Sequence, residues 1–158
     1  MSVPSVLFVC LGNICRSPLA EAALRAEAER AGIAVMVDSA GTGDWHVGNP
    51  PDRRAQATAL GHGIDISGYK ARQVTPSDFT RFSHIYALDA ANLADLERLA
   101  PAEATATLGL LLDLVPGRTG DGVIDPYYGG AEGFVATWDD VSAGAEAIVA
   151  GLRDGTLA

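Results

Sequence analysis

Cysteine is scarce in this chain of 158 residues. It occurs only twice, as Cys10 and Cys15, which excludes the several disulfides that stabilise small secreted scaffolds. The three histidines, His46, His62 and His84, do not combine with these cysteines into the spacing of a zinc site. We therefore expect no metal and no other cofactor, and a reducing, cytoplasmic location.

The chain also lacks long hydrophobic runs and an excess of positive charge. No apolar run reaches the roughly 18 residues that a membrane-spanning helix needs, and no cationic segment followed by an apolar run marks the N-terminus. Lysine and arginine total 11 against 20 aspartates and glutamates, a net charge of −9, which disfavours nucleic acids and anionic membranes as partners. With 48% hydrophobic residues, we expect a single folded domain over residues 1–158. The sequence does not determine the oligomeric state, for which our expectation is a monomer.

Short apolar runs alternate with helical patterns along the whole chain. Apolar runs predict four strands, at residues 6–9, 33–37, 84–88 and 108–112. Helical patterns predict helices at residues 19–31, 52–60 and 134–152, a further helix that Asp89 caps, and a helical turn at residues 77–82. This alternation is typical of an α/β fold, in which helices cover both faces of a parallel sheet. Ligands bind such sheets at the carboxyl ends of the strands.

Residues 5–18 lead from the first strand into the first helix and carry a candidate anion site. Gly12 and Asn13 tolerate unusual backbone angles, so successive N–H groups can point inward and bind an anion. Arg16 adds a planar guanidinium that matches two phosphate oxygens. Cys10 would lie beneath such an anion as a thiolate, positioned for in-line attack on phosphorus.

The helix that follows this stretch supplies further positive potential. We expect Ser17 to cap its N-terminus and Pro18 to occupy its first turn, and such a helix end attracts anions. Because the departing oxygen of a phosphate ester needs a proton, a general acid must come from another segment. Asp125 is the best candidate, since it lies in a loop, precedes a proline and is followed by two tyrosines.

The string Cys-Leu-Gly-Asn-Ile-Cys-Arg-Ser-Pro resembles the phosphate-binding loop of the low-molecular-weight protein tyrosine phosphatases, and Asp-Pro-Tyr-Tyr-Gly is similar to the acid loop of that family. The resemblance covers nearly the whole chain and includes Ser-Ala-Gly-Thr, Trp-His-Val-Gly-Asn-Pro-Pro-Asp, His-Gly-Ile and Lys-Ala-Arg-Gln. It implies a three-layer sandwich whose four parallel strands have the order 2-1-3-4. It also implies hydrolysis of phosphotyrosine, with tyrosine-phosphorylated proteins as substrates and no metal.

This resemblance implies a role for each matching residue. Cys10 is the nucleophile that forms a phosphocysteine, Arg16 holds the phosphate oxygens, and Asp125 protonates the leaving group and then activates water. Ser17 resembles the hydroxyl that stabilises the departing thiolate. The phosphate-binding loop comprises Leu11, Gly12, Asn13, Ile14, Cys15, Arg16 and Ser17.

Support for the loop departs from the family pattern at one position. Asn13 resembles the residue that braces the loop, with Ser39 as its expected partner. Many relatives place a histidine that supports this asparagine just before the Lys-Ala-Arg-Gln stretch, whereas this chain has Tyr69 there, after an apparent one-residue insertion. Cys15 resembles the second loop cysteine of the family, which can form a disulfide with the nucleophile under oxidation; the alternative is a small buried apolar residue.

Side chains near both loops indicate which phosphate ester is bound. The candidates for the walls of a slot that accepts a phenyl ring are Leu11, Ile14, Trp45, Tyr127 and Tyr128. Trp45 could instead be a core aromatic residue. Related arginine phosphatases carry a threonine where this chain has Ile14, so the apolar side chain favours phosphotyrosine over phosphoarginine.

Two alternative functions share this scaffold. An arsenate reductase needs further cysteines to pass a disulfide outward, and this chain has none beyond Cys15. A non-catalytic phosphoprotein-binding module is a second alternative, and the joint presence of Cys10, Arg16 and Asp125 argues against it. We therefore predict an enzyme, a cysteine-dependent phosphotyrosine phosphatase.

Overall fold

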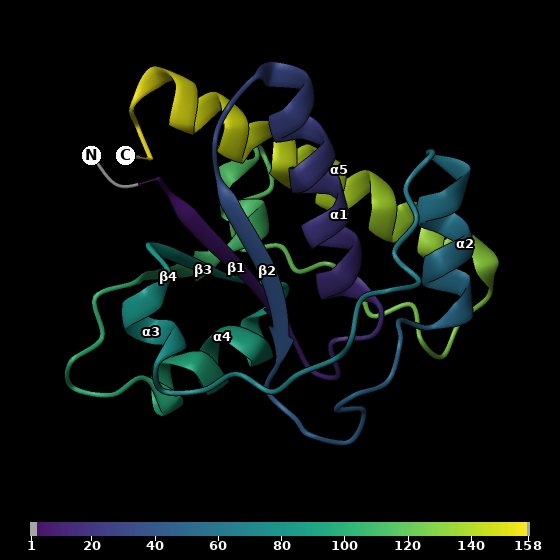
Figure 1. Ribbon diagram of the computed structural model, residues 1–158, viewed down its shortest axis with the longest axis horizontal. Helices are drawn as coiled ribbons and strands as arrows, with labels where there is room; N and C mark the ends of the chain where they lie inside the picture. Colours follow the sequence, from purple (N-terminus) through teal and green to yellow (C-terminus); the bar gives the residue numbers. More distant parts are fainter. Residues whose placement is uncertain (1–2, 158) are drawn as a thin grey trace.

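Four parallel strands form one sheet at the centre of the protein, in the order β2-β1-β3-β4. The computed structural model, shown in Figure 1, describes residues 3–157. The strands are β1 (Ser5–Cys10), β2 (Met36–Gly41), β3 (His84–Ala87) and β4 (Thr107–Leu110). Every pairing between them is parallel, so the predicted sheet and its strand order are confirmed.

Helices cover both faces of this sheet (Figure 1). One face carries α1 (Arg16–Ala31), α2 (Arg53–Gly61) and α5 (Ala131–Asp154), and the other carries α3 (Asp78–Arg81) and α4 (Ala90–Leu99). Side chains of β1 alternate between the two cores: Val6, Phe8 and Cys10 lie in the first, and Leu7 and Val9 in the second. The predicted three-layer sandwich is therefore confirmed, and it places Cys10 on the α1 side.

Local signals placed most helix ends correctly. Gly32 ends α1 in the left-handed conformation, with a φ of 69°. The side chain of Asp52 accepts a hydrogen bond from the backbone N–H of Arg54 and caps α2, and Asp89 caps α4 in the same way through Asn92. The apolar face of α5 belongs to the core, with these side chains buried: Phe134, Trp138, Val141, Ala145 and Ile148.

Two predicted strand ranges are wrong because pairing with a neighbouring strand sets the ends. The second strand was expected at residues 33–37, but β2 runs from Met36 to Gly41, since it pairs residue by residue with the whole of β1. The fourth strand ends at Leu110 and not at residue 112. Its expected last residues instead begin a 3₁₀ helix, η1 (Leu111–Leu114), whose Leu111 packs closely against Gly144 of α5.

The prediction that Ser17 caps the first helix is also wrong. α1 begins at Arg16, its N-cap position is Cys15, and no side chain caps it. Ser17 lies inside the first turn, where its hydroxyl is bonded to the neighbouring loop instead. Pro18 does occupy the first turn, as expected. Within residues 3–157, no helix has both the length and the hydropathy needed to cross a bilayer.

Candidate active site

The loop of residues 11–15 joins the carboxyl end of β1 to the start of α1. Among the described residues, the backbone N–H groups of this loop donate no hydrogen bond to the protein. They are therefore free to bind an anion, next to the N-terminal end of a 16-residue helix. Asn13 adopts a positive φ of 57°, a conformation that asparagine tolerates better than most residues.

Gly41, the last residue of β2, lets this loop pack against the sheet. A Cβ atom at Gly41 would lie 2.7 Å from the carbonyl oxygen of Leu11 and 3.2 Å from the backbone nitrogen of Asn13. Both neighbours are backbone atoms, so they cannot move aside without distorting the loop. Glycine is required at this position for a close approach, not for its backbone angles.

Asn13 braces the loop through all of its amide atoms. Its Nδ2 donates to the hydroxyl oxygens of Ser17 and Ser39, at 2.8 and 2.9 Å, and its Oδ1 accepts from the backbone N–H of Arg72 at 2.9 Å. Ser39 in turn donates to Oε1 of Glu21 at 2.7 Å, because a carboxylate can only accept. Ser39 thus contacts Asn13 as expected, and Glu21 extends the network beyond what sequence analysis identified.

Arg25 balances the charge of Glu21 at the far end of this network. Its Nη2 and Nε donate to Oε2 of Glu21 at 2.9 and 3.1 Å. Burial raises the pKa of the Glu21 carboxyl, although the hydrogen bonds from Ser39 and Arg25 oppose that shift. Burial, followed by the negative charge of Glu21, raises the pKa of the nearby Tyr69 hydroxyl. Within residues 3–157, the side-chain hydrogen bonds of Asn13 go to Ser17, Ser39 and the backbone N–H of Arg72, and none goes to Tyr69.

The sulfur of Cys10 lies at the end of this hydrogen-bond chain. Its Sγ is buried and is 3.0 Å from Oγ of Ser17. Because Ser17 already accepts from Asn13, its own hydrogen is available to the sulfur, which as a thiolate can only accept. The geometry therefore aims one hydroxyl donor at the sulfur.

Arg16 is buried beside Cys10 and is held by one side of its guanidinium. Nη1 donates to Oδ2 of Asp89 at 2.7 Å and to the carbonyl oxygen of Val123 at 2.9 Å, which leaves the Nε–Nη2 edge for a phosphate. Burial lowers the pKa of Arg16, but the charges of Cys10 and Asp89 outweigh it and the net direction is upward. Arg16 therefore stays cationic despite its burial.

Asp89 was identified from the sequence only as a helix cap. One of its oxygens does cap α4, by accepting from the N–H of Asn92 at 2.8 Å, while the other holds Arg16. A signal for this second role was present in the sequence. Asp89 comes two residues after the end of β3, and β3 lies next to β1, so the carboxyl ends of both strands meet at one edge of the sheet.

Asp125 faces the same site from the segment that precedes α5. Its Oδ2 is 3.7 Å from Nη2 of Arg16, and its Oδ1 accepts from the backbone N–H of Tyr127 at 3.0 Å. The side chain of Asp125 is 38% exposed, so it can reach both a bound ester and solvent. The nucleophile, cation and acid expected from sequence are thus brought together.

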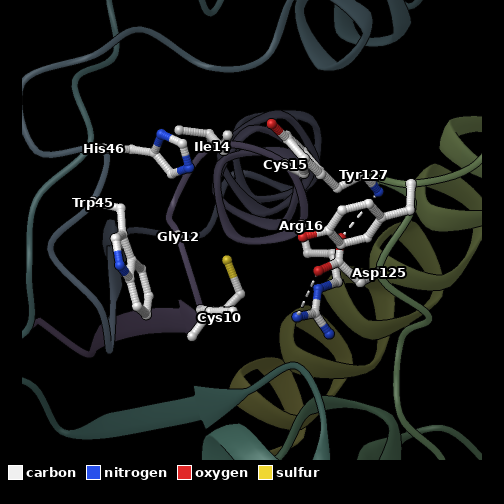
Figure 2. A pocket seen from close by; sticks show the side chains of 11 residues that line it. Cys10, Gly12, Ile14, Cys15, Arg16, Trp45, His46, Asp125 and Tyr127 are labelled. Atoms are coloured by element: carbon white, nitrogen blue, oxygen red, sulfur yellow. Dashed lines mark hydrogen bonds and ion pairs between the residues drawn. The ribbon is translucent and has the colours of Figure 1, made fainter.

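These groups surround a cavity of about 430 Å³. Figure 2 shows the Cys10 sulfur between Arg16 and Asp125 on one side and Trp45 on the other. Of the expected site residues, Asn13, Ser17 and Ser39 do not line the cavity; they support the loop. The lining consists of Cys10, Leu11, Gly12, Ile14, Cys15, Arg16, Trp45, His46, Asp125, Tyr127 and Tyr128.

The aromatic wall contains the expected Trp45 and one residue that sequence analysis missed, His46. Trp45 is 69% exposed, which rules out the core alternative, and its ring folds back against Gly43, where a Cβ would lie 1.9 Å from it. His46, interpreted as an ordinary loop residue, also lines the cavity, beside Gly12 (Figure 2). Its position next to Trp45 in a loop rich in Gly and Pro was the available signal.

Cys15 lies in the wall of the cavity as a buried thiol. Burial, followed by the negative charges of Asp52 and Cys10, raises its pKa. Cys15 therefore rests as a protonated thiol at neutral pH and is not a candidate for the attack on phosphorus. Both cysteines are free in this structure.

Comparison with known proteins agrees with this geometry. Residues 5–156 match the family model described as "Low molecular weight phosphotyrosine protein phosphatase". The low molecular weight phosphotyrosine protein phosphatase of Schizosaccharomyces pombe is 46% identical over 132 residues, covering 82% of this chain and 84% of the relative. The low molecular weight protein-tyrosine-phosphatase of Streptomyces coelicolor is 45% identical over 154 residues, covering 94% and 93%. The crystal structure of YfkJ from Bacillus subtilis superposes with a TM-score of 0.90 at 40% identity, covering 98% of each chain.

Proposed function

This chain belongs to the low molecular weight phosphotyrosine protein phosphatase family and is a phosphatase, and on this premise we propose that it hydrolyses phosphotyrosine in proteins through a phosphocysteine at Cys10. The observation that supports this mechanism is that Cys10, Arg16 and Asp125 line one cavity, next to loop N–H groups that donate to no partner within residues 3–157. A nucleophile, a phosphate clamp and a proton donor are the groups that the reaction requires.

The first step transfers the phosphoryl group to sulfur. The Cys10 thiolate attacks phosphorus, an S–P bond forms, and the bond from phosphorus to the phenolic oxygen breaks. The Nε–Nη2 edge of Arg16 and the loop N–H groups bind the equatorial oxygens, whose charge they stabilise in the transition state. Asp125 donates its proton to the departing phenolate, so that tyrosine leaves as a neutral phenol.

The second step returns the phosphoryl group to water. Asp125, now ionised, accepts a proton from a water molecule that attacks phosphorus, and the S–P bond breaks to release inorganic phosphate. The hydroxyl of Ser17, 3.0 Å from the sulfur, donates to the thiolate as it departs. Asn13 and Ser39 keep that hydroxyl oriented, which is the role we assign to the network behind the loop.

Specificity for an aryl phosphate follows from the cavity walls. A phenyl ring bound above Cys10 would lie between Trp45 and Tyr127, and the apolar Ile14 forms part of the rim. Aromatic walls favour a planar ring over a flexible seryl chain. An apolar side chain at position 14 offers no hydrogen bond to a guanidinium, so phosphoarginine should be a poor substrate.

Cys15 serves, in this proposal, as a redox partner for the nucleophile. Peroxide would oxidise the Cys10 thiolate to a sulfenic acid, and the thiol of Cys15 would then displace water to form a disulfide. Activity lost to peroxide should return with a thiol reductant, and mass spectrometry should find a Cys10–Cys15 bond. Irreversible loss without that bond would contradict this role. Such chemistry fits the reducing, cytoplasmic location that the sequence predicts.

Hydrolysis of p-nitrophenyl phosphate at mildly acidic pH tests the mechanism. Cys10→Ser should abolish turnover while inorganic phosphate still binds, and Asp125→Ala should slow turnover strongly. A phosphotyrosine peptide should be hydrolysed well, and matched phosphoserine and phosphoarginine peptides poorly.

The alternative functions have distinct outcomes in the same assay. Arsenate should inhibit competitively without being reduced; reduction would point to an arsenate reductase. Phosphopeptide binding without turnover would point to a binding module. Substrate trapping with the Cys10→Ser protein would then identify the phosphorylated proteins that it acts on.

A further inference from the structure

Arg54, in the first turn of α2, contacts the segment that carries Asp125. Its Nη2 donates to the carbonyl oxygen of Tyr127 at 2.9 Å, and its Nη1 donates to the carbonyl oxygen of Gly129 at 3.1 Å. Among residues 3–157, Arg54 is the only residue outside 124–154 that donates a hydrogen bond to residues 124–130. Apart from the buried Pro126, this segment largely faces solvent, since Ile124 is 84% exposed and Tyr128 is 91% exposed.

Tyr127 connects this contact to the carboxyl of Asp125. The backbone N–H of Tyr127 donates to Oδ1 of Asp125 at 3.0 Å, and the carbonyl of the same residue accepts from Arg54. Fixing the backbone of Tyr127 therefore fixes the N–H that orients the carboxyl. A carboxyl that must protonate a leaving group needs its second oxygen aimed at the ester, so its orientation matters for catalysis.

The guanidinium of Arg54 is itself held in place on two sides. It lies over the ring of Phe134, 4.7 Å from the ring centroid, and over the ring of Tyr127 at 5.7 Å. Phe134 is fully buried at the start of α5, which packs against α2 (Figure 1). Planar stacking of this kind suits arginine better than lysine.

Asp52 links Arg54 to the phosphate-binding loop. Nε and Nη2 of Arg54 donate to the two carboxylate oxygens of Asp52, each at 3.1 Å. The backbone N–H of Asp52 donates to the carbonyl oxygen of Ile14 at 2.8 Å. One connected path thus runs from the phosphate-binding loop through Asp52 and Arg54 to the backbone that orients Asp125.

We propose that Arg54 is a positioning residue that holds the Asp125 carboxyl in register with the phosphate-binding loop. This inference rests on the proposed function, in which Asp125 is the general acid. Without Arg54, the segment from residue 124 to 130 would sample other conformations and the carboxyl would protonate the leaving group less often. The loss should depend on how much the leaving group needs a proton.

The test compares leaving groups in Arg54→Gln and in Arg53→Gln, its matched control. Arg53 is the exposed neighbour of Arg54, and its substitution removes the same charge. p-Nitrophenolate departs with little help, whereas phenolate needs protonation. The measured ratio is kcat/KM for p-nitrophenyl phosphate divided by kcat/KM for phenyl phosphate. For Arg54→Gln we expect this ratio to rise about tenfold, because a general acid supplies roughly a hundredfold or more and only part of that is lost when the acid is misplaced. The ratio for Arg53→Gln should stay at the wild-type value.

A double-mutant cycle separates positioning from a general structural effect. Adding Arg54→Gln to Asp125→Ala should change the ratio no further, because the group that Arg54 positions is already absent. Arg54→Lys, which keeps the charge but loses the fork, should give an intermediate ratio and provides a second variant if Arg54→Gln folds poorly. Inhibition by inorganic phosphate should be unchanged in every Arg54 variant, since Arg16 and the loop remain in place.

Failure of this inference is distinguishable from failure of the proposed function. If Asp125→Ala leaves the ratio unchanged, the proposed acid role fails. The positioning role alone is overturned if Asp125→Ala raises the ratio but the Arg54 variants leave it unchanged. The same holds if the Arg54 variants lower kcat/KM for both substrates by the same factor. An equal effect of Arg53→Gln would also overturn it, because local charge would then be the cause.

Discussion

Substitution of Asp89 separates two tasks that one carboxylate performs. Its Oδ1 accepts from the N–H of Asn92 and caps α4, while its Oδ2 accepts from Nη1 of Arg16. Asparagine at this position keeps an oxygen for the cap, since asparagine is as good an N-cap as aspartate. It replaces the negative oxygen that faces Arg16 with a neutral amide. Alanine removes both contacts.

The magnitudes of the two losses follow from the burial of Arg16. Its side chain is only 4% exposed, so water does not readily replace a missing partner. A hydrogen bond to a charged group contributes about 1.5–3 kcal/mol, and about 1.4 kcal/mol corresponds to a factor of ten in rate. We therefore expect Asp89→Asn to lower kcat/KM roughly 10- to 100-fold by releasing the Arg16 fork. Loss of the cap in Asp89→Ala should lower the free energy of unfolding by about 1 kcal/mol more.

Steady-state hydrolysis of p-nitrophenyl phosphate and urea unfolding measure the two effects independently. The two variants should share one reduced kcat/KM and a raised inhibition constant for inorganic phosphate, while their free energies of unfolding differ. If Asp89→Asn keeps the wild-type kcat/KM, Arg16 does not depend on this carboxylate and the reasoning is refuted. A further drop in kcat/KM for Asp89→Ala would show that the cap contributes to activity in addition to the ion pair.

Three further substitutions probe the support of the site and of the sheet. Gly41→Ala places a Cβ 2.7 Å from the carbonyl oxygen of Leu11, so we expect a shifted loop and at least about a tenfold loss of p-nitrophenyl phosphate hydrolysis. The control Gly61→Ala, at a position where the space is open, should keep wild-type activity. Burial raises the pKa of the Glu21 carboxyl, so its contribution to stability is present below its unfolded pKa and is lost as pH rises through the folded pKa. In urea unfolding, the free energy of unfolding of Glu21→Gln should therefore fall less than that of wild type between acid and neutral pH, and identical profiles would contradict this. Burial lowers the pKa of the His84 imidazole, so its contribution to stability is present above its unfolded pKa and is lost as pH falls through the folded pKa. The free energy of unfolding of His84→Gln should therefore fall less than that of wild type as pH falls from neutrality, and an unchanged dependence of that free energy on pH would contradict this.

Much of the fold could be predicted because its signals are local. Apolar runs marked β1 and β3, Gly32 marked the end of α1, and the side chains of Asp52 and Asp89 marked two helix starts. The errors concern boundaries that a partner sets. β2 extends to Gly41 because it pairs with all of β1, and residues after Leu110 turn into a 3₁₀ helix that packs under α5.

The candidate site divides in the same way. Cys10, Asn13 and Arg16 could be identified together because they lie within one stretch of seven residues between a strand and a helix start, where backbone N–H groups commonly bind anions. Asp125 could be proposed from the proton that the chemistry requires. By contrast, the contacts of Asp89 with Arg16 and of Arg54 with the Asp125 segment join residues about seventy positions apart. Only the order of the strands could have pointed to Asp89, and nothing local pointed to Arg54.

The sequence by itself determined which chemistry we propose, because the proposed nucleophile, anion-binding loop and phosphate clamp all lie within residues 10–17, where sequence spacing dictates geometry. Only the tertiary structure decided how those groups are held. Parallel strands bring the carboxyl ends of β1 and β3 to one edge, which places Asp89 beside Arg16, and the packing of α2 on α5 places Arg54 over Phe134. Such contacts depend on register and helix packing, which short-range sequence patterns do not encode.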